Sequence, residues 1–310
     1  MYPLKFNNLY YEKIWGGREL EKFRANVPSG NIGESWDVAC HEHGVSTVIN
    51  GEFKGKTLQE LIDSYGEKIL GNKIEEETFP LLLKIINSKE NLSIQVHPQD
   101  EYARKVEKSM GKTEAWYVLE AEKGATIVLG TKDCGKDEFH QGIKNDTLHQ
   151  YINTIEVKKG EVYFIPSGMI HSIGRGITLV EIQENSDITY RVYDYGRGRE
   201  IHIEKSLDVI DFSLNGCKTN PMVEEHSGYT KQTHCTCSYF ALEEYKISIS
   251  LSEEARGERF YIYTCVEGSG EIISKDYKET ISYGESILIP ASLGEYKLVG
   301  QMKVLKTYVP

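Results

Sequence analysis

A strand–turn segment, Gly-Glu-Val-Tyr-Phe-Ile-Pro, occupies residues 160–166, and a close copy, Gly-Glu-Ser-Ile-Leu-Ile-Pro, occupies residues 284–290. In each copy a glycine precedes a short apolar strand and a proline ends it. Short strands separated by glycine and proline turns are typical of a double-sheet jelly roll, whereas a parallel sheet needs more helices. The repeated unit therefore predicts a mainly β chain that contains two related barrels.

Only a few segments have the spacing of a helix. In residues 57–70 apolar side chains recur at helical spacing, and Gly71 follows as a stop signal. A polar, turn-rich stretch at residues 215–234 predicts a domain boundary. We expect one domain over 1–215, with helical insertions, and a second barrel over 216–310. The other short helices that we expect cover residues 99–108, 136–151 and 203–212.

The composition excludes several classes of partner. The formal net charge is −11, from 36 Lys and Arg against 47 Asp and Glu, which argues against binding to nucleic acid. No apolar run approaches the ~20 residues that span a bilayer, and the N-terminus lacks the apolar core of a signal peptide. We expect a cytoplasmic protein with no membrane partner, whose six scattered cysteines stay reduced.

The first copy of the strand–turn unit is followed by a histidine. From Pro166 the chain runs Pro-Ser-Gly-Met-Ile-His, so a rigid turn directs the imidazole of His171 toward the sheet. In the second copy the matching position is Glu295. A histidine held after a rigid turn suits a metal ligand, although a purely structural histidine would give the same pattern. We expect that only the first barrel binds metal.

Three more side chains could complete the same site. Gln95 and His97 alternate along a predicted strand and so face the same side, and Glu114 stands just before another apolar strand. Any strand edge can carry two alternating polar residues. Together with His171, however, these residues offer nitrogen and oxygen ligands from separate strands. The sequence therefore predicts a metal site inside the first barrel.

Two further groups have residue types that can bind metals. For His41-Glu-His43, next to a glycine, we prefer the interpretation of a solvated turn. The group His234-Cys-Thr-Cys237 has no second Cys/His pair with zinc spacing nearby, so alternation at the start of a strand explains it better.

Several motifs resemble known families. The pattern Gly-x5-Pro-x-Gly-x2-His resembles the second metal motif of the cupins, so the two jelly-roll barrels would be of cupin type. More specific motifs resemble type I mannose-6-phosphate isomerases in their short bacterial form. They are Leu-Ser-Ile-Gln-Val-His-Pro at 92–98, Gly-Lys-Thr-Glu-Ala-Trp at 111–116, Asp-Ile-Thr-Tyr-Arg at 187–191, Trp-Gly-Gly at 15–17 and Gly-Glu-Ser-Trp at 33–36.

The resemblance implies a zinc-dependent aldose–ketose isomerase that interconverts mannose 6-phosphate and fructose 6-phosphate. It implies that Arg191 is the active-site arginine and that Lys112 and Asp187 line the site. Longer members have an extra helical domain, which the insertion at 137–151 is too small to replace, so the cover of the pocket stays open. One zinc ion per chain would have the ligands Gln95, His97, Glu114 and His171.

This isomerisation moves a proton between C2 and C1 through a cis-enediol, and a Lewis acid would polarise the carbonyl. We expect Lys112 to be the general base, with Glu181 and Asp187 as alternatives. Lys84 interrupts an apolar run and should face the barrel interior, where it could bind the phosphate or form a structural salt bridge. Arg191 could serve the enediolate or the phosphate, or pair with a carboxylate on the surface.

Two other functions stay open from the sequence. A different metal-dependent cupin enzyme, such as an epimerase or an oxygenase, could use the same barrel, because one fold hosts many chemistries. A sugar-binding module with a purely structural metal would have a closed site without a cavity. For the isomerase the expected partner is a small-molecule sugar phosphate, and the sequence is compatible with a monomer or a dimer.

Overall fold

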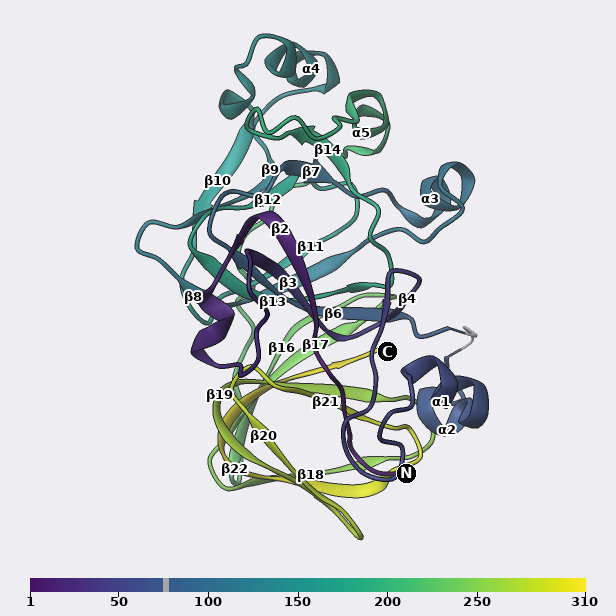
Figure 1. Cartoon of the computed structure of the whole chain (residues 1–310). Helices are drawn as coiled ribbons and strands as arrows, with labels where there is room; N and C mark the ends of the chain where they lie inside the picture. Colours follow the sequence, from purple (N-terminus) through teal and green to yellow (C-terminus); the bar gives the residue numbers. More distant parts are fainter. Residues whose placement is uncertain (75–77) are drawn as a thin grey trace.

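The computed structural model describes residues 1–74 and 78–310, and within them strands far outnumber helices (Figure 1). The predicted mainly β class is confirmed. The strands form three larger sheets and a small hairpin of β4 (Cys40–His41) and β5 (Gly44–Val45). Within the described residues, no helix has both the length and the apolar character that crossing a bilayer requires.

A six-stranded antiparallel sheet occupies the middle of the molecule (Figure 1). Alternation along one of its strands, β6, turns Leu83 and Ile85 to one face and Lys84 and Ile86 to the other. Lys84 therefore points to the inner side of the sheet. In order across the sheet, the strands are β11 (Val162–Ile165), β8 (Glu114–Ala121), β13 (Ile177–Glu184), β6 (Leu81–Ser88), β2 (Leu9–Gly17) and β3 (Ile32–Val38).

A five-stranded sheet packs on the inner face of the six-stranded sheet. One buried cluster contains side chains of both, among them Ile86 and Trp116 from the larger sheet and Ile127 and Ile173 from the smaller. Part of the space between the two sheets is therefore an apolar core. In order, the strands of the smaller sheet are β10 (Ile152–Glu156), β9 (Thr126–Thr131), β12 (His171–Ile173), β7 (Ile94–Val96) and β14 (Tyr190–Tyr193).

A nine-stranded sheet with its own buried cluster forms the C-terminal part. Its strands are β1 (Leu4–Lys5), β21 (Ser286–Ile289), β19 (Tyr261–Ser274), β22 (Gly294–Tyr308), β17 (Ala241–Ile247), β16 (Tyr229–Thr236) and β15 (Glu224–His226), with β18 (Ser250–Ala255) and β20 (Lys278–Ser282) paired at the side.

Two features of this sheet differ from the sequence-based expectation. The hairpin of β15 and β16 lies mostly within the stretch 215–234, which we predicted to be polar and turn-rich. In addition, β1 brings residues 4–5, from the predicted first domain, into pairing with β21. The domain boundary after residue 215 stays a prediction.

The two copies of the strand–turn unit have the same local structure. Gly160 and Gly284 have φ angles of 85° and 80°, a region that glycine occupies without the strain of a side chain. Each glycine leads into a four-residue strand, β11 in the six-stranded sheet and β21 in the nine-stranded sheet. The repeat in the sequence is thus a repeat in structure.

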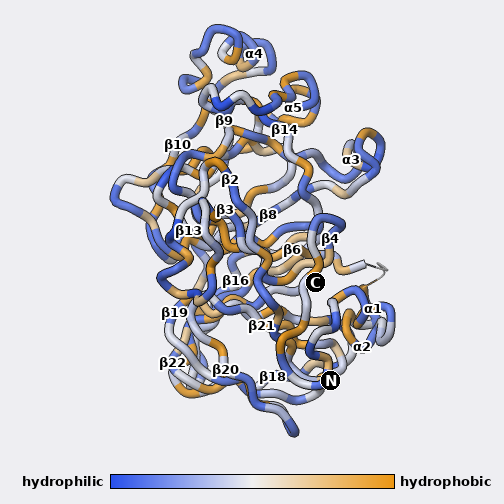
Figure 2. Tube along the Cα trace, viewed as in Figure 1, coloured by the Kyte–Doolittle hydropathy of each residue, from blue (hydrophilic) through white to orange (hydrophobic). Residues whose placement is uncertain are grey.

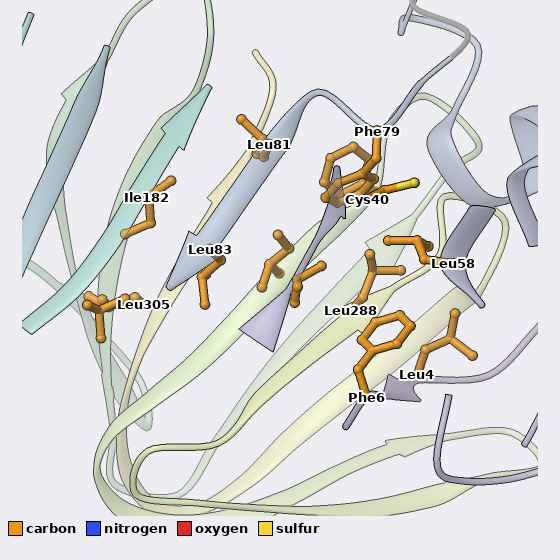
Figure 3. Packing of buried hydrophobic residues seen from close by; sticks show 14 of the residues in the cluster. Leu4, Phe6, Cys40, Leu58, Phe79, Leu81, Leu83, Ile182, Leu288 and Leu305 are labelled. Carbon is orange, nitrogen blue, oxygen red and sulfur yellow. The ribbon is translucent and has the colours of Figure 1, made fainter. Parts of the chain in front are cut away.

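The outer face of the six-stranded sheet packs on the nine-stranded sheet. A buried cluster joins Leu83 and Ile182 of the first to Leu288 and Leu305 of the second (Figure 3). Because both faces are apolar, their contact removes hydrophobic surface from water. The C-terminal sheet therefore supports the sheet whose other face lines the site.

The helices lie at the periphery. The prediction of one continuous helix over 57–70 was wrong, because Gly66, with a φ of 42°, separates α1 (Leu58–Tyr65) from α2 (Glu67–Leu70). α4 (Lys136–Lys144) and α5 (Ile203–Val209) cover the outer face of the five-stranded sheet (Figure 1), and α4 is mostly hydrophilic (Figure 2). The structure also describes α3 (Asp100–Val106) and short 3-10 turns at Glu19–Lys22 and Leu148–Gln150.

Candidate active site

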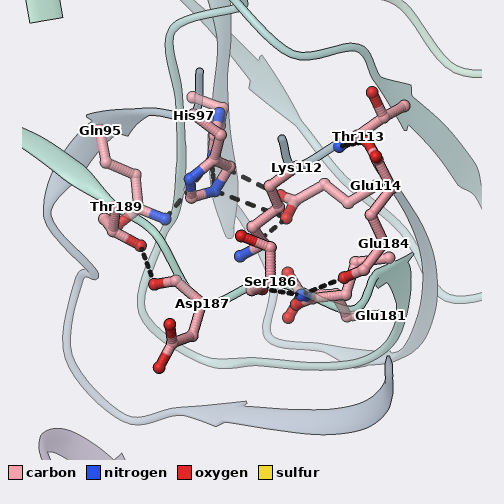
Figure 4. Close-up of polar contacts among 12 residues, drawn as sticks. Gln95, His97, Lys112, Thr113, Glu114, Glu181, Glu184, Ser186, Asp187 and Thr189 are labelled. Carbon is pink, nitrogen blue, oxygen red and sulfur yellow. Dashed lines mark hydrogen bonds and ion pairs between the residues drawn. The ribbon is translucent and has the colours of Figure 1, made fainter. Parts of the chain in front are cut away.

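A cavity of about 310 Å³ lies between the six-stranded and five-stranded sheets. Two of the side chains predicted from the sequence, His97 and Glu114, are buried next to this cavity (Figure 4). The fold therefore brings together all nine side chains predicted from the sequence. The seven that line the cavity itself are Lys84, Gln95, Lys112, His171, Glu181, Asp187 and Arg191.

His97 and His171 face each other in the interior. The Nδ1 atom of His97 lies 2.7 Å from the carbonyl oxygen of Ile188, and that of His171 lies 2.9 Å from the carbonyl oxygen of Met169. A carbonyl only accepts hydrogen bonds, so both Nδ1 atoms carry a proton and each neutral ring has its lone pair on Nε2. The two Nε2 atoms are 3.1 Å apart, so both lone pairs point into the same small space.

Glu114 completes a triangle with the two imidazoles. Its Oε2 lies 3.5 Å from His97 Nε2, and its Oε1 lies 3.5 Å from His171 Nε2. Neither oxygen accepts a hydrogen bond of normal geometry from residues 1–74 or 78–310, although Lys112 Nζ is 3.1 Å from Oε2. Burial lowers the pKa of His171 to about 4 and lowers the pKa of His97 well below its ordinary value, so both rings are neutral at pH 7.

A metal cation fits this group. The three ligand atoms lie within 4.8 Å of one another, and two imidazoles with one carboxylate are ligands that zinc accepts. Buried lone pairs without a donor are costly, and a cation would satisfy them. Gln95 Nε2 lies 3.3 Å from His171 Nε2. A 180° flip of the Gln95 side-chain amide would place Oε1 there as a fourth ligand.

The turn after the first strand–turn unit fixes these ligands in place. The N–H of Gly168 donates to the carbonyl of His97 at 2.9 Å, and Gly168 has a φ of 87°. His171 pairs with Gln95 across β12 and β7. The turn and both ligand-bearing strands therefore form one hydrogen-bonded unit. For this reason the local turn motif was enough to predict the direction of the His171 side chain.

Charged side chains surround the rest of the cavity. Lys84 Nζ lies 3.9 Å from Glu34 Oε2 and 3.7 Å from Glu181 Oε2. Burial lowers the pKa of Lys84, and burial together with the charge of Glu114 raises the pKa of Glu181. Although burial alone would raise it, the charge of Lys84 lowers the pKa of Glu34 to about 2. The lysine and Glu34 thus form a buried ion pair at neutral pH.

Arg191 stands on the cavity wall and is only partly exposed. Its Nη1 donates to the carbonyl of Glu200 at 2.8 Å, while its Nε has no hydrogen-bond partner. Within the described residues it forms no ion pair, in contrast to the neighbouring Arg199, which donates to Asp194 at 2.9 Å. No carboxylate of the described residues therefore neutralises the Arg191 guanidinium, which leaves its charge for an anionic ligand.

The two groups set aside in the sequence have different outcomes. The interpretation as a solvated turn holds for His43, which is exposed, but not for His41, whose side chain is 9% exposed. Both imidazoles approach Asp187 at the cavity wall, with His43 Nδ1 2.6 Å from Oδ2 and His41 Nε2 3.9 Å from Oδ1. His234 lies near the end of β16 and contacts Thr219, and no metal-ligand group gathers around it in the described part of the chain.

Four other cavity-wall residues with a charged or imidazole side chain were missed from the sequence. Glu34 had a usable signal, because it alternates with Trp36 along β3 and both line the cavity. Lys13 had the same signal, because it alternates with Trp15 along β2 and both line the cavity. Arg199 and His202 stand between β14 and α5, where no alternation indicates the direction of a side chain. The missed residues are Lys13, Glu34, Arg199 and His202.

Comparison with known proteins identifies the family. A family model described as phosphomannose isomerase type I, catalytic domain, matches residues 3–134, and one described as mannose-6-phosphate isomerase, cupin domain, matches residues 230–309. The chain is 36% identical to mannose-6-phosphate isomerase ManA of Bacillus subtilis (strain 168), and the alignment covers 99% of both proteins. The chain belongs to the type I phosphomannose isomerase family. The recognition made from the motifs is confirmed, as is the enzyme predicted from it.

Other members of the family agree over the whole length. Mannose-6-phosphate isomerase of Streptococcus mutans is 34% identical, with 99% of this chain and 98% of that protein covered. The crystal structure of mannose 6-phosphate isomerase from Bacillus subtilis superposes with a TM-score of 0.93 at 33% identity, covering 99% of each chain. A putative mannosephosphate isomerase from Archaeoglobus fulgidus has a TM-score of 0.79 at 22% identity over 99% of this chain and 97% of that one, which shows a shared fold.

Proposed function

We propose that this phosphomannose isomerase family member interconverts mannose 6-phosphate and fructose 6-phosphate through a cis-enediol. The observation that carries the proposal is the convergence of His97, Glu114 and His171 beside a cavity lined by lysines, carboxylates and an arginine. The lining side chains each have a use in the reaction: a cation can stabilise the enediolate or bind the phosphate, and a carboxylate can accept a proton. The adjacent cavity also counts against a closed, purely structural metal.

The ligand set supports one zinc ion per chain, held by Gln95, His97, Glu114 and His171. When bound, zinc supplies a Lewis acid that polarises the sugar carbonyl and stabilises negative charge on its oxygen. Because two neutral imidazoles and an amide leave only Glu114 as a charged ligand, the centre would keep a net positive charge. Native iron would instead support an oxygenase.

Glu181 is better placed than Lys112 to act as the general base. Lys112 Nζ lies 3.1 Å from Glu114 Oε2, where it is held as a cation. Glu181 lines the cavity, and Trp116 Nε1 donates to its Oε1 at 3.2 Å. Its raised pKa also moves toward the range that suits proton transfer near neutral pH. We assign the proton transfer to Glu181 and charge stabilisation to Lys112, with Asp187 as the remaining alternative for the base.

Arg191 is a better phosphate ligand than Lys84. The charge of Lys84 is already matched by Glu34 and Glu181, and these two carboxylates would repel a phosphate. Arg191 forms no ion pair with the described residues and lies close to a second cation, Arg199. A phosphate held there by the planar guanidinium would leave the other end of the sugar to reach the metal ligands.

A coupled assay for fructose 6-phosphate tests the proposal, with mannose 6-phosphate as substrate. We expect turnover that a chelator abolishes and added zinc restores. Activity that survives complete metal removal, verified by elemental analysis, would contradict the metal mechanism. If the zinc-loaded protein forms another hexose 6-phosphate instead, it is an epimerase.

The expected cellular location and the oligomeric state both stay predictions. The cytoplasmic location rests on the sequence alone. Whether the chain is a monomer or a dimer is decided by its mass in solution, which light scattering measures directly.

A further inference from the structure

The hairpin of β4 and β5 stands beside the cavity, with His43 at its turn. The Tyr11 hydroxyl donates to the carbonyl of His43 at 2.8 Å and fits against Gly44, where any side chain would collide with it. His41 packs edge-on against Trp36, with ring centroids 5.7 Å apart, and Trp36 lines the cavity. Contacts from β2 and β3 therefore fix the position of the turn.

The loop after β13 is bound to this hairpin at two points. Asn185 Nδ2 donates to the carbonyl of Cys40 at 2.8 Å. Two residues later, Asp187 Oδ2 accepts a hydrogen bond from His43 Nδ1 at 2.6 Å, a length typical of a charge-assisted bond. The hairpin thus holds two side chains of the loop, Asn185 through a backbone carbonyl and Asp187 through an imidazole.

The same loop reaches the candidate metal ligands. The carbonyl of Ile188 accepts the Nδ1–H of His97 at 2.7 Å, and Asp187 and Thr189 line the cavity on either side of it. Asp187 therefore stands between the hairpin and the metal ligands, where an entering sugar would meet its carboxylate.

We propose that His43 is a positioning residue, whose Nδ1–H holds the Asp187 carboxylate in place to accept hydrogen bonds from hydroxyl groups of the hexose phosphate. The inference rests on the proposed function and adds a residue to it. Asp187 is 39% exposed, so without a partner its side chain would sample several rotamers, and ordering it on binding would cost conformational entropy. His43 orders it in advance, because Tyr11 fixes the turn.

A second metal site is the competing interpretation, since ligand atoms of His41, His43 and Asp187 lie within 4.8 Å of one another. Hydrogen bonding explains the geometry better. His41 Nδ1 accepts the backbone N–H of His43 at 3.2 Å, so the proton of the neutral ring is on Nε2, which faces Asp187. That nitrogen has no lone pair to offer a metal.

The test is a double-mutant cycle in the zinc-loaded full-length enzyme, with His43→Ala, Asp187→Ala and the double variant. We expect His43→Ala to lower kcat/KM by roughly tenfold, the size of one lost hydrogen bond to a charged group. In the Asp187→Ala background the same change should have almost no further effect. His43→Asn, whose amide can still donate, should recover most of the loss.

A matched control is Glu42→Gln, which changes a charge on the same turn and should leave kcat/KM, metal content and melting temperature unchanged. Equal losses from His43→Ala in both backgrounds, or no rescue by asparagine, would overturn the positioning role. So would inhibition by excess zinc that His43→Ala relieves, because it would assign the three side chains to a metal. An inactive wild type would refute the proposed function, so the two failures are distinguishable.

Discussion

His97 Nε2 and His171 Nε2 lie 3.1 Å apart, while the Nδ1–H of each ring is engaged by a backbone carbonyl. Two lone pairs cannot satisfy each other, so this geometry suits a third group that is a cation or a hydrogen-bond donor. The carbonyls that set the tautomers belong to Ile188 and Met169, on two different loops. The site is therefore specified by backbone positions as well as by the ligands themselves.

Removing one imidazole should release the metal. We expect His97→Ala to weaken zinc binding more than the loss of a residue that only hydrogen-bonds to a ligand, which costs roughly 10–100-fold, because His97 is itself a proposed ligand. Zinc per chain after dialysis, measured by elemental analysis, checks this. His149→Ala, at an exposed histidine remote in the sequence from the ligands, is the control, and equal zinc in both variants would refute the ligand assignment.

Loss of the arginine should affect turnover without affecting the metal. We expect Arg191→Ala to lower kcat/KM by about 100-fold or more, as for other single charge-stabilising donors. Zinc content should stay at the wild-type level, because Arg191 contacts none of the ligand atoms in the described hydrogen bonds. Arg175→Ala, at an exposed position, serves as the control in the same assay. Wild-type kcat/KM for Arg191→Ala would remove this residue from the site.

The buried lysine should be needed for stability. Lys84→Met leaves Glu34 and Glu181 without their shared cation, and breaking a buried ion pair costs about 3–5 kcal/mol. Lys13→Met is the matched comparison, because Lys13 also contacts Glu34, at 3.0 Å, but is one-third exposed, and such pairs contribute roughly 0–1 kcal/mol. Urea unfolding at pH 7 measures both. Equal stability of the two variants would show that Lys84 does not offset the carboxylates.

How much the sequence could predict depended on whether a signal was local. His171 followed from a turn, Gln95 and His97 from alternation, and Lys84 from one charge within an apolar strand. In each case the direction of the side chain is set by its own strand or turn, so the pattern was sufficient. Their role in the reaction rests on the resemblance and on the proposals above.

Contacts between distant segments left no such signal. The pairing of β1 with β21 joins the two ends of the chain, and the contact of His43 with Asp187 joins two loops. Nothing near either partner in the sequence indicates the other, because each contact exists only after the sheets have packed. The interruption at Gly66 was local, but a glycine within a helical pattern is tolerated often enough that its effect depended on packing.

Glu184 should make stability fall as the pH rises. Burial raises the pKa of Glu184 from 4.5 to about 8. The backbone N–H of Thr113 donates to Oε1 at 2.6 Å and lowers this pKa, but by less than burial raises it. Among the described residues, Oε2 has no hydrogen-bond partner. The folded protein therefore keeps Glu184 protonated at pH 7, whereas the unfolded chain releases the proton above pH 4.5. The stabilisation is complete below pH 4.5 and is lost as the pH rises toward 8.

Replacing Glu184 by glutamine removes this titration while keeping an acceptor for Thr113. We expect Glu184→Gln to become progressively more stable than the wild type between pH 5 and 8, by up to about 1.4 kcal/mol per pH unit. Urea unfolding at several pH values measures the difference, with the exposed Glu122→Gln as control. Parallel stability profiles for Glu184→Gln and the wild type would mean that the carboxyl is already ionised in the folded protein.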